Sequence, residues 1–208
     1  MNPNSELFKV VFLGDSGYLY QSLILGRVGK TSFIMCSESR PSSEYEPTIG
    51  SDFHVKHYKV DNSHVRLQIW DTAGQERFHS IESSYYHRVD CCVLMFDVTK
   101  NQTLDSLYNW KEKFAIMANI ENLEHFPFFV VANKIDLDES GDGKHTMAVN
   151  DLCSSGNFSY FESSAKKRWN VENIFQSIAT TMTQTRGERC DQVLLSSAPV
   201  KHGRRSCC

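Results

Sequence analysis

The stretch that decides the fold reads Val65-Arg66-Leu67-Gln68-Ile69-Trp70-Asp71-Thr72-Ala73-Gly74-Gln75. Its first part alternates apolar and polar side chains, which is typical of a half-buried β-strand. Directly after this strand, the Asp71 carboxylate has the chemistry to hold Mg²⁺ through water, and Gly74 has no side chain to keep its N–H away from a phosphate. The Gln75 amide can orient an attacking water molecule. The stretch therefore predicts a strand whose carboxyl end serves phosphate chemistry.

Further strands are expected on both sides of this stretch. Besides 65–70, they are expected at Phe8–Leu13, Phe53–Tyr58, Cys91–Val98 and Phe126–Ala132. The two alternating strands form a hairpin through the turn residues Asp61-Asn62-Ser63, and the continuous apolar runs indicate strands covered on both faces.

Helices are expected between the strands. Residues Thr31–Met35 are expected to start the first helix. The second has apolar side chains at helical spacing over 104–118, after a Thr103 suited to capping, and the third includes Val171–Ile178. Strands alternating with helices predict an α/β fold: a mostly parallel sheet with one antiparallel hairpin strand and helices on both faces. Residues 1–184 are assigned to this domain and 185–208 to a flexible polar tail.

The composition narrows the class of protein. A chain of 208 residues suits one domain plus a tail, and a formal charge of −3 gives no reason to expect nucleic acid as a partner. The seven cysteines are odd in number and lack metal-type spacing, which favours a reducing cytosol over a disulfide framework. Residues 1–6 are polar and carry no apolar signal core, and no apolar run reaches the ~18 residues of a membrane span.

A phosphate-binding loop is present in two halves. Gly14-Asp15-Ser16-Gly17 ends the first apolar run, and Val28-Gly29-Lys30-Thr31-Ser32 resumes after the ten residues 18–27. Without those ten the chain would contain a complete G-x-x-x-x-G-K-[ST] loop, but the position five before Gly29 is Ile24, so the strict motif fails. Such a loop binds phosphates through backbone N–H groups and the Lys ammonium, and its Thr hydroxyl binds Mg²⁺.

Two further motifs follow predicted strands. Asn133-Lys134-Ile135-Asp136 carries an amide and a carboxylate suited to reading the edge of guanine, and a Lys stem that can lie along the ring. Glu162-Ser163-Ser164-Ala165-Lys166 follows the apolar pair Tyr160-Phe161. Each motif is weak alone, but the set is specific in this order and at strand ends.

With these motifs in place, the chain resembles the Ras-like small GTPases, and more closely their Rab branch, over about residues 7–182. Residues typical of Rabs are Thr48 to Phe53, Trp70 before Asp71, Glu76-Arg77-Phe78 and Tyr85-Tyr86. The runs at Asp90 to Leu94 and Asn173 to Ala179, with Phe126-Pro127-Phe128, look most like the late-endosomal branch. The resemblance implies a P-loop NTPase fold and a GDP/GTP switch that binds and hydrolyses GTP with Mg²⁺ and regulates vesicle and endosomal membrane trafficking.

The resemblance also assigns roles to individual residues. Gln75 would position the hydrolytic water, and Thr31, Thr48 and Asp71 would hold Mg²⁺. The nucleotide would contact Gly14, Asp15, Ser16, Gly17, Val28, Gly29, Lys30, Thr31, Ser32, Thr48, Gly74, Asn133, Lys134, Asp136, Ser164, Ala165 and Lys166. Effectors would bind a surface made of Ile49, Phe53, Trp70, Phe78 and Tyr85.

Partners and location follow from the same resemblance. Cys207-Cys208 is similar to the double-cysteine ending of Rabs that carry two geranylgeranyl groups, enough for stable membrane anchoring. The implied partners are an exchange factor, a GTPase-activating protein, a GDP-dissociation inhibitor, an escort protein and effectors. The implied location is the cytosolic face of late-endosomal or vacuolar membranes, with cycling through the cytosol.

The inserted residues 18–27 leave alternatives open. Closing an extra ten-residue loop costs on the order of 2 kcal/mol plus a constant, so the fold should survive, whereas lost phosphate contacts cost ~1.5–3 kcal/mol each. The insertion is then a tolerated loop, or it disables nucleotide binding and leaves a prenylated interaction module. In a third interpretation it is an unspliced intron or another error of the gene model, absent from the real protein.

Two smaller departures from the Rab pattern concern the switch regions. Lys30 and Thr48 are 18 positions apart, one fewer than in the family, and Pro41 falls where the family has an aromatic that packs on guanine. The segment Tyr85 to Val89 also lacks the Gly that the family places after its Arg, which alters this switch.

Overall fold

The computed structural model describes residues 5–16, 27–36, 51–72, 83–120, 122–138, 149 and 158–196. Within these, one six-stranded sheet has the order β2-β3-β1-β4-β5-β6. Its strands are β1 (Ser5–Leu13), β2 (Ser51–Val60), β3 (Ser63–Thr72), β4 (Cys91–Asp97), β5 (Phe128–Asn133) and β6 (Phe158–Glu162). β2 and β3 pair antiparallel and the other neighbours pair parallel. The predicted mostly parallel sheet with one antiparallel hairpin strand is thus confirmed.

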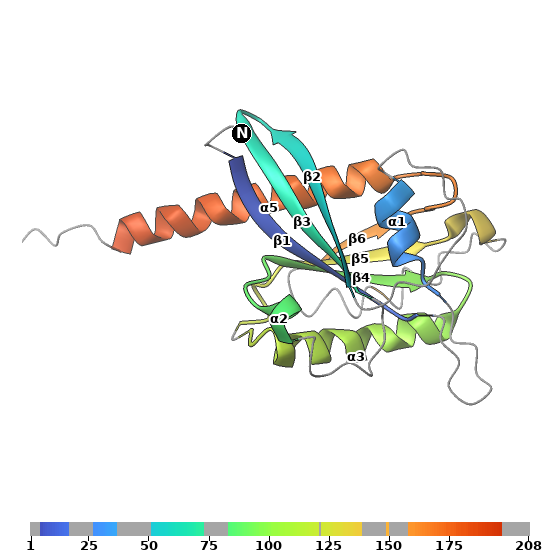
Figure 1. Ribbon diagram of the computed structural model, residues 1–208. Coiled ribbons are helices and arrows are strands. Elements are labelled where there is room, and N and C mark those ends of the chain that lie inside the picture. The colour runs from blue at the N-terminus through green and yellow to red at the C-terminus, as the bar shows by residue number, and fades with distance from the viewer. Residues whose placement is uncertain are drawn as a thin grey trace, which may run out of the picture.

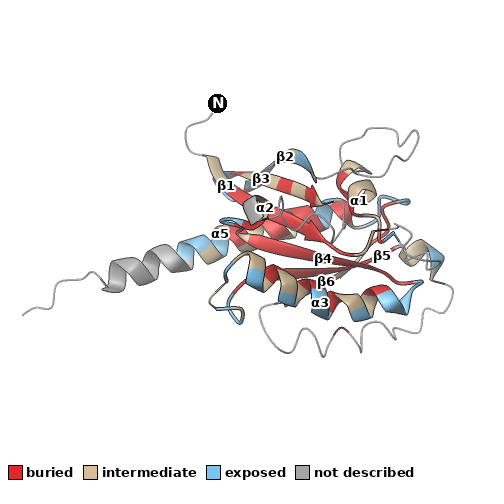
Figure 2. Cartoon of the chain, turned by 60° about the horizontal axis from the view of Figure 1, so that its bottom comes forward, coloured by how far each residue is buried: buried red, intermediate tan, exposed pale blue. Residues whose placement is uncertain are grey.

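Helices cover both faces of the sheet (Figure 1). They are α1 (Lys30–Cys36), α2 (Ser83–Tyr86), α3 (Asn101–Met117) and α5 (Val171–Ser196), with a 3-10 turn η1 (Ile135–Leu137). α1 and α5 pack on one face, where the rings of Phe12, Phe33 and Phe175 have centroids 5.4–5.9 Å apart. α3 packs on the other face, where Phe114 contacts Phe128. Every residue of β4 and β5 is buried, as their continuous apolar runs predict (Figure 2).

The hairpin and the strand starts differ slightly from the sequence-based bounds. The turn is confined to Asp61-Asn62, with Asp61 at a φ of 51°, and Ser63 already belongs to β3. β5 begins at Phe128 because Pro127 has no N–H for the ladder, although its carbonyl accepts a hydrogen bond from the Cys92 N–H at 3.3 Å.

Thr103 is not the cap residue of α3, and that prediction was wrong. The helix starts at Asn101, and the cap position is held by Lys100, which makes no side-chain cap hydrogen bond. Thr103 is buried in the first turn, where its hydroxyl donates to the Lys100 carbonyl and accepts the Asp97 N–H at 3.0 Å. The hydroxyl therefore fastens α3 to the end of β4.

Helix α5 continues to Ser196, so the predicted boundary at 184/185 falls inside it. Arg186 helps to hold the helix on the sheet, because its guanidinium lies 4.4 Å from the centroid of the Phe8 ring and 3.9 Å from the Glu6 carboxylate. Beyond this point α5 projects past the sheet (Figure 1). Residues 197–208, the rest of the predicted tail, lie outside the described residues.

Arg88 occupies a backbone conformation that favours glycine. Its φ is 55°, while its side chain is exposed, and it ends the turn that leads from α2 to β4. A side chain in the left-handed region costs roughly 1–2 kcal/mol. The glycine that the Rab pattern has in this segment is thus missing where the backbone needs one.

Candidate nucleotide site

The predicted site residues gather at the carboxyl edge of the sheet. The front half of the phosphate loop follows β1, and the rear half leads into α1. Asp71 lies at the end of β3, Asn133 ends β5 and Ser164 follows β6. Because parallel strands end at the same edge, chain segments far apart in sequence meet there. The described site residues form two connected parts, a phosphate side and a base side.

The rear half of the phosphate loop centres on Lys30. This side chain is 5% exposed, and its Nζ donates a hydrogen bond of 2.6 Å to the Gly14 carbonyl. Burial lowers the pKa of Lys30 to about 8, against the opposing effects of Asp71 and Asp15. Lys30 thus joins the two halves of the loop, and its charge is sensitive to pH in the mildly alkaline range.

Thr31 and Asp71 present oxygen atoms next to Lys30. The Thr31 hydroxyl donates to Asp71 Oδ2 at 2.5 Å, and burial raises the pKa of Asp71, with the Thr31 hydrogen bond and Lys30 opposing. A hydroxyl and a carboxylate side by side are hard oxygen donors of the kind that Mg²⁺ takes. The residues present fit a magnesium ion, for which the third predicted ligand, Thr48, lies outside the described residues.

The front half of the loop is held against β4 and α3. Gly14 has a φ of 147°, and a Cβ there would lie 2.3 Å from the Met95 carbonyl oxygen, so only glycine fits. The Asp15 Oδ1 accepts a hydrogen bond of 2.8 Å from the indole N–H of Trp110 on α3.

The described chain segments on either side of the insertion meet. The Val28 N–H donates to the Asp15 carbonyl at 3.3 Å, and Gly29 follows with a φ of 90°. Arg27, rather than Gly17, is therefore the residue that enters the rear half of the loop. Gly17 and the inserted residues 18–26 lie outside the described residues.

On the base side, Asn133 connects two loops. Its Nδ2 donates to the Val28 carbonyl at 2.8 Å, and its Oδ1 accepts the Ala165 N–H at 3.1 Å. The residue is buried, and a Cβ on Gly29 would lie 2.9 Å from Nδ2, so glycine is required there as well. This amide holds the phosphate loop and the Ser163-Ser164-Ala165 loop in one arrangement.

Lys134 links the insertion boundary to β4. It has a φ of 68°, and its Nζ donates to the Arg27 carbonyl at 2.5 Å and to Asp97 Oδ2 at 2.7 Å. Burial would raise the pKa of Asp97, but hydrogen bonds from Lys134 and Thr99 lower it overall. The ammonium is thus paired with a carboxylate whose side chain is 1% exposed.

Asp136 is oriented by the neighbouring loop. The Ser164 hydroxyl donates to Asp136 Oδ1 at 2.5 Å and accepts the Lys167 N–H at 3.0 Å. Lys166, also among the predicted contacts, is exposed. The carboxylate and the Ala165 backbone therefore lie within one hydrogen-bonded unit.

The predicted effector residues Phe53, Trp70 and Tyr85 form a second cluster, named the aromatic surface here. Phe53 faces Trp70 across the β2–β3 pair with ring centroids 5.3 Å apart, and Tyr85 contacts Trp70 at 5.2 Å. Phe53 is 45% exposed, so the cluster is not a core. Lys9 adds a cation 4.7 Å from the centroid of the Trp70 ring.

Asp97 and Trp110 belong to the site region but were missed by the sequence analysis. Asp97 was treated as part of the apolar run 91–98, although a carboxylate at the end of a buried strand is a signal by the same logic that identified Asp71. Trp110 was assigned only to the helical pattern, and nothing in that pattern indicates a contact with Asp15. Further predicted residues lie outside the described ones: Gly17, Thr48, Ile49, Gly74, Gln75, Phe78, Cys207 and Cys208.

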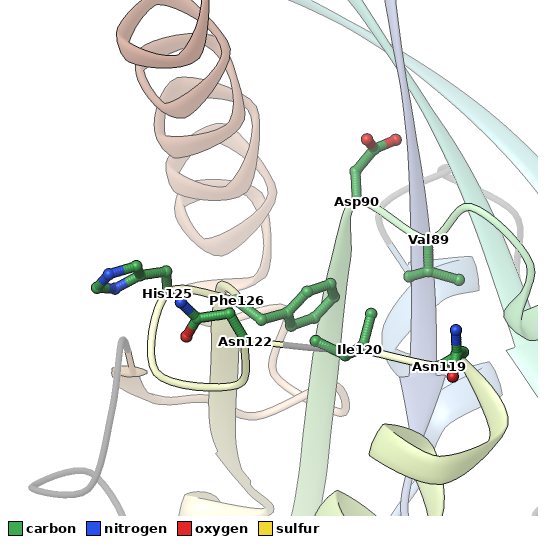
Figure 3. Close-up of a pocket in the computed structure, with 7 residues that line it drawn as sticks. All are labelled: Val89, Asp90, Asn119, Ile120, Asn122, His125 and Phe126. Carbon is green, nitrogen blue, oxygen red and sulfur yellow. The ribbon is translucent and has the colours of Figure 1, made fainter. Parts of the chain in front are cut away.

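A hollow of about 350 Å³ lies at the opposite edge of the sheet, before β4 and β5 (Figure 3). Ile120 and Phe126 point toward one another in it, whereas His125 points away (Figure 3). The Asp90 carboxylate accepts a hydrogen bond of 2.7 Å from the backbone N–H of Lys9, so this side chain stabilises the fold. None of the described residues that line the hollow is a predicted site residue.

Comparisons with known proteins agree with this architecture. The model of the Ras family matches residues 9–184. The chain therefore belongs to the Ras family, the class of small GTPases to which its sheet and its site motifs point.

Within that family, the similarity is to Rab7 proteins. The chain is 44% identical to Ras-related protein Rab-7a of Dictyostelium discoideum over 83% of this chain and 81% of the relative. It is 43% identical to Ypt/Rab-type GTPase Rab7 of Neurospora crassa, with 83% and 80% covered, and 43% identical to Ras-related protein Rab7 of Pisum sativum, with 83% and 81% covered. The resemblance to the Rab branch and its late-endosomal members is confirmed. Among the described helices, none is both long and apolar enough to cross a bilayer.

Proposed function

We propose that the chain is a GDP/GTP switch that binds and hydrolyses GTP with Mg²⁺ and regulates endosomal and vacuolar membrane trafficking through effectors. The observation that supports it best is the buried Asn133 amide, which joins Val28 of the phosphate loop to Ala165 of the base-side loop. This contact joins the phosphate side to the base side, and one nucleotide would contact both.

Each side has a distinct chemical task. Lys30 lies at the phosphate loop, where its ammonium would neutralise the outer phosphates. Asp136 and the Ala165 N–H would read the guanine edge, and Lys134 would lie along its ring. Gly74 would contact the γ-phosphate, and Gln75 would orient the hydrolytic water.

Magnesium would be held by Thr31 and Thr48, and through water by Asp71. When bound, the ion neutralises charge on the phosphate oxygens. The protein's part is to hold the Thr31 hydroxyl and the Asp71 carboxylate in contact, as the 2.5 Å hydrogen bond between them does.

The insertion is compatible with this function if its ends stay together. The Val28–Asp15 hydrogen bond closes the intervening chain at its base, and the Lys30–Gly14 contact spans the same break. Neither contact depends on the inserted residues. We therefore expect the full chain to retain nucleotide.

The decisive experiment measures fluorescent-GDP binding with Mg²⁺ in the full chain and in two shortened chains. One lacks residues 18–27, so that Gly17 precedes Val28, and the other lacks 17–26, so that Arg27 precedes it. Lys30→Met in the full chain provides a matched control, because it removes the ammonium that would contact the phosphates. We expect the full chain and both shortened chains to bind, and the Lys30→Met control to bind far more weakly.

The other outcomes separate the alternatives. Binding by both shortened chains but not by the full chain would mean that the insertion disables the site. Binding only by the chain that lacks 18–27, in which Gly17 directly precedes Val28, would assign the defect to Arg27. If all forms bound GDP no better than the Lys30→Met control, the switch function would be wrong.

Membrane and effector binding form the second part of the proposal. Prenylated Cys207 and Cys208 would anchor the chain, and the aromatic surface would dock an effector together with Ile49 and Phe78. Its exposed Phe53 next to Trp70 supports such a contact. After prenylation in vitro, flotation with vesicles is expected for the native chain and lost in the Cys207→Ser/Cys208→Ser variant. Equal flotation of both would contradict the lipid anchor.

A further inference from the structure

We propose that Trp110 is a positioning residue that holds Asp15, and through it the front half of the phosphate loop, in place beside the insertion. This inference rests on the proposed nucleotide-binding function. It assigns to α3 a direct part in the site, which the sequence pattern of that helix does not indicate.

The contact has the geometry of a specific interaction. Trp110 Nε1 donates to Asp15 Oδ1 at 2.8 Å across 95 positions of the sequence, and Trp110 is 9% exposed. An N–H donor on a carboxylate is a charge-assisted hydrogen bond, about twice as strong as a neutral one. The other carboxylate oxygen, Asp15 Oδ2, is shielded from solvent and has no hydrogen-bond partner among the described residues. The indole is thus the main attachment of this side chain in the described part of the chain.

The position of Asp15 explains why this attachment matters. Its carbonyl accepts the Val28 N–H, the hydrogen bond that closes the base of the insertion. In an uninterrupted loop, the short chain between these residues would restrict Asp15, but here residues 16–27 intervene. The rear half has its own attachments, through Asn133 to Val28 and Lys134 to Arg27. Trp110 provides the corresponding attachment for the front half.

The same contact orients a carboxylate that acts on Lys30. Asp15 interacts electrostatically with Lys30, whose ammonium must be available to phosphates. A carboxylate released from the indole is free to approach that ammonium and compete with the nucleotide. Loss of the Trp110 hydrogen bond should therefore speed nucleotide release.

The first test is an NMR spectrum of the full chain that records the indole N–H resonance of Trp110, in the native chain and in Asp15→Ala. This substitution removes the acceptor but leaves the core packing of Trp110 unchanged. We expect the resonance to shift and its exchange with solvent to become faster. An unchanged resonance would overturn the proposed contact, whether or not the chain binds nucleotide.

The second test measures fluorescent-GDP dissociation in Trp110→Phe, which keeps an aromatic ring in the core but removes the N–H. We expect release to become about tenfold faster. In a chain that lacks 18–27, where the loop is continuous, the effect should shrink to about twofold or less. Tyr108→Phe on the exposed face of α3 is the matched control, with release unchanged.

A double-mutant cycle separates positioning from general stability. If Trp110 acts through Asp15, adding Trp110→Phe to Asp15→Ala should change the release rate no further. If Trp110→Phe speeds GDP release equally in the native chain and in Asp15→Ala, the positioning role is overturned and Trp110 has a packing role. If the full chain bound no GDP, the proposed function would fail, whereas the NMR test would still decide the contact.

Discussion

The base side and the phosphate side of the site are held together in different ways. On the base side, the Asp136 carboxylate and the Ala165 N–H sit in loops joined directly by the Ser164 and Asn133 hydrogen bonds. On the phosphate side, the loop is interrupted, and each half is fastened to other elements, the front to Trp110 and the rear to Asn133 and Lys134.

The difference teaches that the two described halves of an interrupted loop can each be held by neighbouring elements. Five contacts hold the described ends of the loop. The Lys30–Gly14 and Val28–Asp15 hydrogen bonds cross the break, and Trp110, Asn133 and Lys134 bind the loop from other elements. The phosphate side therefore depends on neighbours in a way that an unbroken loop would not. The following predictions sharpen this comparison, from the largest expected effect to the smallest.

Asn133→Ala should weaken both sides at once. It removes two buried hydrogen bonds and leaves the Val28 carbonyl and the Ala165 N–H without their partner. We expect a loss of about 3 kcal/mol in GDP binding, or roughly a hundredfold in affinity, measured by fluorescence titration. Ser164→Ala, which affects the base side alone, is the comparison and should cost about 1 kcal/mol. Equal effects of the two would contradict the linking role of Asn133.

Lys134→Met should destabilise the fold by about 2 kcal/mol, a value between those of exposed and fully buried ion pairs. The substitution leaves the buried Asp97 carboxylate without its cation and releases the Arg27 carbonyl. Urea denaturation measures the effect. Adding Asp97→Asn should recover part of the stability, because the unpaired charge is then removed. A double variant less stable than Lys134→Met would argue against the charge pairing.

Affinity for GDP should fall as the pH rises above about 8. The pKa of Lys30 is lowered to about 8 in the nucleotide-free chain, and bound phosphate anions favour its charged form, so binding above this pH takes up a proton. The expected decrease is up to about tenfold for each pH unit. Titrations between pH 6.5 and 9.5 measure it, with Lys30→Met as the control that should lack this slope. A flat profile for the native chain would refute the role of Lys30 as the titrating phosphate ligand.

Arg88→Gly should have the smallest effect and should leave both sides of the site unaltered. Arg88 has a φ of 55°, which glycine adopts without strain. We expect a gain of about 0.5–1 kcal/mol in the free energy of unfolding after subtracting the entropy cost of glycine. Arg88→Ala, which keeps a Cβ in the same conformation, should bring no such gain. Thermal unfolding compares the two.

Local patterns in the sequence were enough to predict five of the six described strands and the positions of the motifs, whereas the apolar pair Tyr160-Phe161 alone indicated β6. Apolar runs identify β4 and β5, and alternation identifies the β2–β3 hairpin, because burial imposes those patterns directly. The contact between Trp110 and Asp15 could not be predicted this way, since helical spacing explains Trp110 completely without it.

The misassigned cap has a similar cause. Thr103 is a good capping residue, but its hydroxyl is instead used to hold α3 on the end of β4, a tertiary contact that outweighs the local preference. The pairing of Lys134 with Asp97 likewise joins two strand ends and has no local pattern in the sequence.

The three tryptophans give the molecule a built-in set of optical probes. Trp110 reports on the phosphate loop through its hydrogen bond to Asp15, Trp70 lies in the aromatic surface, and Trp169 is 51% exposed beside the Ser164 loop. Trp110 is kept because its hydrogen bond to Asp15 is part of the site, and replacing Trp70, Trp169 or both by phenylalanine would give three chains that differ only in the remaining probes. Differences in their emission would then report separately, without any attached dye, on the phosphate loop, the aromatic surface and the base-side loop during one nucleotide exchange.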